Sequence, residues 1–209
     1  ASALMSNETG YADVLDVAGY NYQEFRYESD HKKYPARPLY GSENGMSLEG
    51  WNAVEQNDYV AGQFLWTGIE YLGEAGQYPS RHSTSGLIDL AGNKKPEFFF
   101  RQSLWSNRPM VWLGTTDRIS TTETDNLWAH KRVEPLWNYK EGQIISVNAF
   151  TNCEEVELYL NDKSLGVKKL ADFANRTISL DVPFEPGELK AVAKNGGAIT
   201  STCSLYTYG

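Results

Sequence analysis

The chain has 209 residues, 41% of them hydrophobic and 22% charged, with a mean hydropathy of -0.50. This composition is that of a globular chain able to bury a core, which excludes a fibrous or disordered protein. The formal net charge of -8 at pH 7 would repel phosphate backbones, so we expect no nucleic-acid partner. No run of about 18 apolar residues is present, and we therefore expect no segment that spans a membrane.

Acidic and aromatic side chains are concentrated in the first half of the chain. Residues 1–105 carry 14 acidic and 8 basic side chains and 17 of the 27 aromatic ones. Aromatic rings beside carboxylates are typical of sugar-binding sites, because the rings stack on the C–H faces of pyranoses and the carboxylates accept hydrogen bonds from hydroxyl groups. The alternative is that the rings fill a hydrophobic core, and composition does not separate the two.

Residues 1–105 alternate between strand and helix patterns. Apolar runs predict strands at 14–22, 38–41 and 59–66, and the segments that follow predict helices at 24–33, 47–57 and 96–105. The apolar runs do not alternate with polar residues, which is typical of strands buried on both faces in a parallel sheet covered by helices. We therefore predict an α/β domain over residues 1–105.

The pattern changes in residues 106–209. Short strand-like segments, most of them alternating apolar with polar residues, are separated by turn signals at 145–149, 156–160, 178–182, 189–193 and 199–206. With no helix between them, they predict an antiparallel β-sandwich of immunoglobulin-like type. Residues 106–140 have no clear period, and we predict a first strand and a surface loop there. Cys153 and Cys203 lack the spacing of a metal site, so we expect buried thiols, with a single disulfide as the alternative.

Candidate site residues follow the three predicted strands of the first half, because the carboxyl ends of parallel strands carry the sites of such folds. Glu43 lies between Gly41 and Gly45 directly after an apolar run, so we expect its carboxylate to face a cleft whose backbone a ligand can approach. The same pattern could be a turn that caps the next helix. Glu70 and Glu74 could be acids of the site, or they could share a solvated helix face. The polar side chains at the three strand ends are Asn21 and Tyr22, then Ser42, Glu43 and Asn44, and finally Trp66, Thr67 and Glu70.

Metal, nucleotide and serine-hydrolase sites have little support. His31, His82 and His130 lie far apart in the sequence, and none has a second ligand at metal-binding spacing. No glycine-rich phosphate motif is present, and Ser42 does not lie in a nucleophile elbow. We expect neither a metal nor a cofactor.

Four segments of the first half resemble glycoside hydrolase family 2, in particular the C-terminal barrel portion of its bacterial β-galactosidase-like members. They read DVAGYNY at 16–22, PLYGSE at 38–43, DYVAGQFLWTGIEYLGE at 58–74 and GLIDLAGNKKP at 86–96. VELYLN at 156–161, with 164–166, resembles the immunoglobulin-like domain that follows this barrel. The resemblance covers nearly the whole chain. It implies strands six to eight of a (β/α)8 TIM barrel over residues 1–105, followed by an immunoglobulin-like β-sandwich over residues 106–209.

The resemblance implies a retaining exo-glycosidase that hydrolyses terminal β-D-galactosides with two carboxyl groups about 5 to 5.5 Å apart. Glu43 would be the nucleophile, Tyr22 would donate a hydrogen bond to it, and Trp66 would be an aromatic platform for the sugar. Further contacts to sugar hydroxyls would come from Asn21, Glu70 and Arg81, although the family more often has an Asp at the position of Glu70. The family's acid/base Glu follows an Asn at the end of strand four, which has no counterpart in residues 1–209. We therefore expect this chain to be a piece of a longer enzyme and inactive alone.

Other interpretations stay open. β-Glucuronidase and β-mannosidase activities occur on the same scaffold, and the aromatic residues also fit a carbohydrate-binding module without chemistry or a structural docking domain. A carbohydrate is the expected substrate. The outer strands of a partial barrel would expose unpaired edges, which suggests self-association. For the longer protein we favour a periplasmic or secreted location, with the cytoplasm as the alternative.

Overall fold

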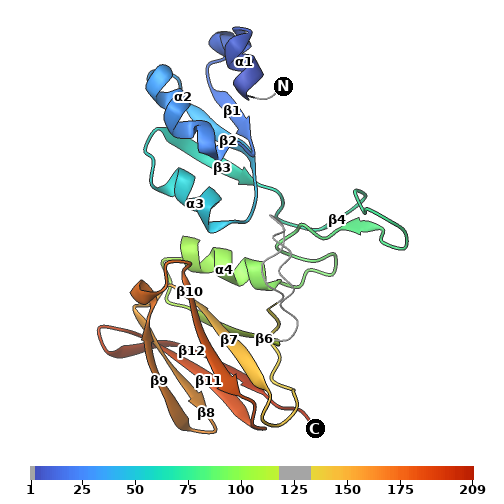
Figure 1. The fold of residues 1–209 in the computed structure, drawn as a ribbon, viewed down its shortest axis with the longest axis vertical. Helices are drawn as coiled ribbons and strands as arrows, with labels where there is room; N and C mark the ends of the chain where they lie inside the picture. Colours follow the sequence, from blue (N-terminus) through green and yellow to red (C-terminus); the bar gives the residue numbers. More distant parts are fainter. Residues whose placement is uncertain (1–2, 118–132) are drawn as a thin grey trace. The chain divides into compact units, whose positions relative to one another are not determined.

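A computed structural model describes residues 3–117 and 133–209 of the chain, which divides into two compact units, residues 1–93 and 94–209 (Figure 1). Strands predominate over helices. The boundary predicted from the sequence falls after Trp105, whereas helix α4 (Pro96–Trp105) belongs to the second unit because it contacts strands β6 and β7. Among the described residues, no helix is long and apolar enough to cross a membrane.

Three parallel strands form the centre of the first unit. They are β1 (Ala18–Asn21), β2 (Leu39–Asn44) and β3 (Val60–Leu65), in the spatial order β1-β2-β3. Leu39 of β2 pairs with Ala18 on one side and with Val60 on the other. The predicted parallel pairing is confirmed, but the first strand begins later than expected. Val14 is 78% exposed and ends a 3-10 turn, because no neighbouring strand of the described chain pairs with residues 14–17.

Helices connect these strands as predicted. α2 (Tyr27–Lys33) follows a 3-10 turn, η2 (Glu24–Arg26), and α3 (Leu48–Glu55) follows β2. α3 begins after Ser47, whose hydroxyl accepts a hydrogen bond from the backbone N–H of Gly50 at 3.0 Å. The unit begins with α1 (Ala3–Glu8) and η1 (Tyr11–Val14). Its buried hydrophobic cluster consists of Ala3, Ala18, Tyr20, Tyr27, Leu39 and Val60.

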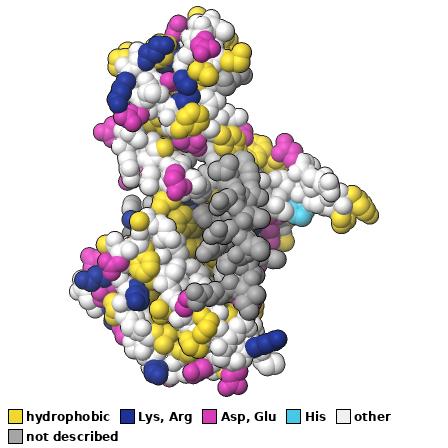
Figure 2. Space-filling view, in the orientation of Figure 1, with side chains coloured by type: hydrophobic (Ala, Val, Ile, Leu, Met, Phe, Trp, Pro, Cys, Tyr) yellow, Lys and Arg dark blue, Asp and Glu magenta, His cyan; other side chains and the backbone are white. Residues whose placement is uncertain are grey.

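A short hairpin lies beyond β3 in the same unit. It consists of β4 (Tyr71–Leu72) and β5 (His82–Ser83), paired antiparallel. Figure 2 shows hydrophobic side chains gathered at the end of the segment that carries β4 in Figure 1, and Leu72 and Tyr78 are 75% and 85% exposed. Glu70 and Glu74 flank β4, so the predicted alternative of a shared helix face is wrong.

The second unit consists of α4 and two antiparallel sheets. The three-stranded sheet has the order β10-β7-β6 and the four-stranded sheet has the order β12-β11-β8-β9. Their bounds are β6 (Val111–Asp117), β7 (Ile144–Thr151), β8 (Glu155–Leu160), β9 (Lys163–Lys169), β10 (Thr177–Pro183), β11 (Glu188–Asn195) and β12 (Ala198–Tyr206), with a 3-10 turn η4 (Leu170–Asp172).

Both sheets contribute to one hydrophobic core. On β7 the side chains of Ile145, Val147 and Ala149 are fully buried, and on β8 those of Val156 and Leu158 are. This spacing of two confirms the alternation seen in the sequence, because successive strand residues point to opposite faces. The core therefore lies between the two sheets, as in a sandwich.

Three further sequence predictions concern this unit. The strand expected within residues 106–140 is β6, whereas much of the expected surface loop falls on residues 118–132, outside the described chain. Cys153 is buried and Cys203 is half-buried, and both are free thiols, so the disulfide alternative is wrong. The helix predicted at 96–105 is α4, with Pro96 in its first turn, where a missing N–H costs nothing.

Candidate active site

The carboxyl ends of β1, β2 and β3 bring together three segments that are distant in the sequence. Asn21 at the end of β1 lies opposite Glu43 of β2, and the backbone N–H of Tyr22 donates to the carbonyl of Glu43 at 2.9 Å. The backbone N–H of Trp66, just after β3, donates to the carbonyl of Asn44 at 2.9 Å. The parallel sheet thus places Tyr22, Glu43 and Trp66 along one edge.

Tyr22 and Glu43 form the central pair of this edge. Tyr22 has a φ of +52°, in the left-handed region that residues other than glycine seldom adopt. Burial raises the pKa of Tyr22 well above its usual value, and the nearby carboxylate of Glu43 raises that pKa further. The phenol is protonated at neutral pH, and a protonated phenol beside a carboxylate can donate a hydrogen bond to it. Both side chains are half-buried, so each keeps a face open to solvent.

Trp66 is supported by the β4–β5 hairpin. Its ring meets that of Tyr71 edge to face, with 5.7 Å between the ring centroids and an interplanar angle of 82°. The hydroxyl of Tyr71 donates to Glu74, and the peptide bond between Trp66 and Thr67 is cis. The Trp66 ring is thus packed against Tyr71, and its side chain remains half-exposed.

The three remaining predicted contacts occupy different surroundings. Glu70 is only 8% exposed, and its Oε2 lies 3.6 Å from Nε2 of His82 on β5. Arg81 is exposed on the loop that leads into β5, and Asn21 is exposed at the end of β1. The structure therefore pairs Tyr22 with Glu43, whereas Glu70 faces the hairpin and Arg81 faces solvent.

Sequence reasoning missed a buried network beside Glu43. The side chain of Asn44 is fully buried, and its Nδ2 donates to Oε1 of Glu24 at 2.6 Å and to the hydroxyl of Tyr27 at 3.3 Å. Asn44 was visible as a polar strand-end residue, and Glu24 lies two positions after Tyr22. Their contact depends on how β1 and β2 pair, which no local pattern shows.

Gly41 has a different role from the one expected. The sequence suggested that Gly41 keeps the backbone open to a ligand. In the structure, a Cβ at this position would lie 1.8 Å from Oδ1 of Asn44 and 2.8 Å from the Tyr27 hydroxyl. The glycine therefore makes room for the buried amide of Asn44.

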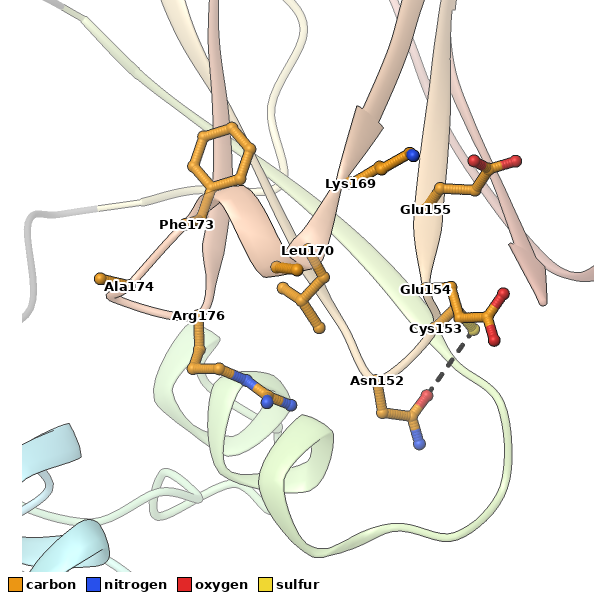
Figure 3. A pocket seen from close by; sticks show the side chains of 10 residues that line it. Asn152, Cys153, Glu154, Glu155, Lys169, Leu170, Phe173, Ala174 and Arg176 are labelled. Atoms are coloured by element: carbon orange, nitrogen blue, oxygen red, sulfur yellow. Dashed lines mark hydrogen bonds between the residues drawn. The ribbon is translucent and has the colours of Figure 1, made fainter. Parts of the chain in front are cut away.

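No metal cluster adjoins this pair in the described chain. Among the described residues, no three His, Cys, Asp or Glu side chains lie close enough to hold a metal ion, and His130 falls outside that part of the chain. A pocket of about 690 Å³ lies in the second unit, around the start of β8 and the end of β9 (Figure 3). Its Asn152 already bonds the carbonyls of Ser106 and Arg108, so part of the lining has a structural role.

Replacing Gly41 tests the buried network. We expect Gly41→Ala to lower the free energy of unfolding by about 1–3 kcal/mol, because the new methyl group would displace Asn44 or Tyr27. The matched control is Gly68→Ala, since a Cβ at Gly68 meets nothing within 4 Å; we expect a change within about 0.5 kcal/mol. Urea unfolding of both variants measures the difference, and equal stabilities would contradict the packing described.

Comparison with known proteins places the chain among glycosidases. A family described as "Domain of unknown function (DUF4982)" matches residues 142–201. Beta-galactosidase BoGH2A of Bacteroides ovatus is 34% identical over 77% of this chain and 17% of its own length. A Beta-glucuronidase of Formosa agariphila is 24% identical over 76% of this chain and 14% of its own length. A crystal structure of a glycosyl hydrolase family 2 member from Bacteroides cellulosilyticus is 35% identical, with a TM-score of 0.84, over 93% of this chain and 28% of its own length.

The chain therefore spans less than a third of the length of each of these relatives. Identity and fold agree over most of its residues, and the relatives are glycoside hydrolases. The chain belongs to glycoside hydrolase family 2, as the resemblance in the sequence predicted, and corresponds to a part of its relatives.

Proposed function

We propose that residues 1–209 are part of a retaining exo-glycosidase that hydrolyses terminal β-D-galactosides, with Glu43 as its nucleophile. The observation that carries the proposal is the meeting of Tyr22 and Glu43 at the ends of adjacent parallel strands, where the backbone N–H of Tyr22 donates to the carbonyl of Glu43. A retaining glycosidase needs a carboxylate that attacks the anomeric carbon and a second carboxyl group that acts first as acid and then as base. A half-exposed carboxylate held by a protonated phenol fits the first role.

The proposed mechanism gives each side chain a separate task. An oxygen of Glu43 attacks the anomeric carbon while the bond to the leaving oxygen breaks, and the leaving group takes a proton from the acid/base carboxyl. The acid/base then removes a proton from water, which attacks the anomeric carbon and releases Glu43. Tyr22 orients the carboxylate by hydrogen bonding, and the exposed part of the Trp66 ring offers a stacking surface for the sugar.

The acid/base carboxyl is expected outside residues 1–209. The acidic side chains around Glu43 already have partners: Glu24 accepts from Asn44, Glu74 accepts from Tyr71, and the buried Glu70 faces His82. We therefore do not assign the acid/base role to any of the three. This agrees with the family resemblance, which implies that the acid/base Glu lies on an earlier strand.

The architecture supports the same proposal. We assign β1, β2 and β3 to strands six, seven and eight of a (β/α)8 barrel over residues 1–105, and the two antiparallel sheets to an immunoglobulin-like domain over residues 106–209. Barrel enzymes carry their catalytic groups at the carboxyl ends of the strands. Tyr22, Glu43 and Trp66 occupy that position on the parallel sheet.

The preference for a neutral sugar rests on charge. The relatives include proteins named as a β-galactosidase and as a β-glucuronidase. A glucuronate carboxylate would meet an acidic surrounding here, because Glu24, Glu43, Glu70 and Glu74 all belong to the segments around the proposed site. Repulsion between like charges disfavours such a substrate. We therefore propose β-galactosides, with Asn21 and Arg81 as further contacts to hydroxyl groups.

Covalent labelling tests the nucleophile. With an aryl 2-deoxy-2-fluoro-β-galactoside, we expect the full-length enzyme that carries these residues to gain one glycosyl group on Glu43, detected by peptide mass spectrometry. Glu43→Gln should abolish the label, whereas Glu49→Gln, at an exposed position of α3, should keep it. Binding without a label would favour a non-catalytic carbohydrate-binding module, and labelling only by the glucuronide analogue would favour β-glucuronidase specificity.

The isolated chain provides a second test. We expect purified residues 1–209 to show no turnover of an aryl β-galactoside, because loss of proton assistance alone costs about 10²- to 10⁴-fold in rate. A sensitive fluorogenic substrate makes this measurable. Turnover that disappears in Glu43→Gln would show that the acid/base lies within these residues after all.

Exposed strand edges motivate a proposal about assembly. β1 and β3 are the outer strands of the three-stranded sheet, and each has one edge without a strand partner in the described chain. Such edges pair readily with other strands. We expect isolated residues 1–209 to self-associate, with a mass in light scattering that rises with concentration, and a monomer mass at all concentrations would contradict this.

A further inference from the structure

Asn44 is the point at which three segments of the proposed site meet. Its side chain bonds Glu24, from the turn after β1, and Tyr27, from α2, and its backbone carbonyl accepts from Trp66 after β3. It is also the residue next to Glu43 on β2. A change at this one side chain would therefore act on the turn after β1, on α2 and on the strand end that carries Glu43.

We propose that Asn44 is a positioning residue for the nucleophile, acting through its amide hydrogen bond to Glu24. This inference rests on the proposed function, because it assigns Asn44 to the reaction of Glu43. The contact differs from an ordinary surface hydrogen bond. It is 2.6 Å long, one partner is a carboxylate, and the Asn44 side chain has 0% exposure. Hydrogen bonds to charged groups are the stronger ones, and a buried polar group that loses its partner is costly.

The chemistry of the network requires an amide at position 44. The carboxylate of Glu24 can only accept, so the group facing it must donate. Asp has nearly the same shape as Asn but would place a second carboxylate against Glu24. The resulting repulsion would push the end of β2 away from the turn that carries Glu24.

Glu24 also connects the network to Tyr22. Its negative charge adds to burial and to Glu43 in raising the pKa of Tyr22, so the Glu24 carboxylate lies within electrostatic range of the phenol. The Glu24 carboxylate therefore interacts with two neighbours of Glu43. Its charge acts on Tyr22, and its Oε1 accepts a hydrogen bond from Asn44. In this proposal, the hydrogen bond from Asn44 holds the Glu24 carboxylate in place beside Tyr22 and beside the strand end that carries Glu43.

A pair of substitutions with a built-in rescue tests the inference in the full-length enzyme. The readout is the first-order rate constant for labelling by the 2-fluoro-β-galactoside, which does not depend on the fraction of enzyme that is folded. We expect Asn44→Asp to slow labelling about 10- to 100-fold, the loss of a hydrogen bond to a charged group. Glu24→Gln alone should change the rate less than about threefold, because the amide oxygen still accepts.

The double variant is the decisive comparison. Combining Asn44→Asp with Glu24→Gln reverses donor and acceptor, so labelling should return to within about fivefold of the wild-type rate. Asn52→Asp, on the half-buried face of α3, is the matched control and should label at the wild-type rate. If Asn44→Asp does not fold, Glu24→Ala removes the same hydrogen bond from the half-buried side and should slow labelling similarly.

The outcomes separate this inference from the proposed function. If the wild-type enzyme is not labelled at Glu43, the proposed function fails. If the wild type is labelled and Asn44→Asp labels equally fast, Asn44 does not position the nucleophile. A slow single variant with an equally slow double variant would also overturn the inference, because the effect would then not pass through Glu24. A purely structural role would lower the melting temperature and leave the labelling rate constant unchanged.

Discussion

The parallel pairing of β2 with both β1 and β3 is the constraint on which the candidate site depends. Parallel strands that enter a sheet at one edge all leave it at the other, so residues that follow them meet whatever their separation in the sequence. Tyr22, Glu43 and Trp66 meet for this reason, through backbone hydrogen bonds of 2.9 Å on either side of β2. An antiparallel arrangement of the same segments would send every second end to the opposite edge.

Packing beneath this edge adds a second requirement. The amide of Asn44 is fully buried, and it occupies space that a side chain at position 41 would fill. Its hydrogen bonds to Glu24 and Tyr27 compensate for the lost hydration of the amide nitrogen, whereas the buried Oδ1 has no hydrogen-bond partner. Asn44, next to the proposed nucleophile, is therefore held by buried hydrogen bonds. Gly41, two positions before Glu43, belongs to the packing of the site.

Much of the fold was predictable because hydrophobic periodicity reports burial. Continuous apolar runs gave the parallel strands, and alternation such as Ile145, Val147 and Ala149 gave the antiparallel sheets. The start of β1 was predicted too early, because apolar residues such as Val14 lie exposed on a turn. The surroundings of Glu70 were not predictable either, since its partner His82 lies on another strand of a hairpin that has only two residues per strand.

The candidate site was likewise predictable only where local sequence was sufficient. Glu43 was identifiable from its place after an apolar run, whereas the link between Glu24 and Asn44 exists only once β1 and β2 are paired. The local sequence therefore indicates which side chains could react, such as Glu43. Tertiary contacts determine which side chains position them, such as Asn44 and Glu24.

The carboxylates around Glu43 have side-chain partners, whereas Glu43 itself has no ion pair among the described residues. Among the described residues, each neighbouring carboxylate is engaged by a donor or faces a histidine, while no cation forms an ion pair with Glu43. A Lys or Arg bound to this carboxylate would stabilise its charge and weaken it as a nucleophile. A neutral phenol orients the carboxylate and leaves most of its charge available for attack on an anomeric carbon. In the proposed mechanism, Tyr22 is therefore a better partner for Glu43 than a basic residue would be, because its phenol is neutral near pH 7.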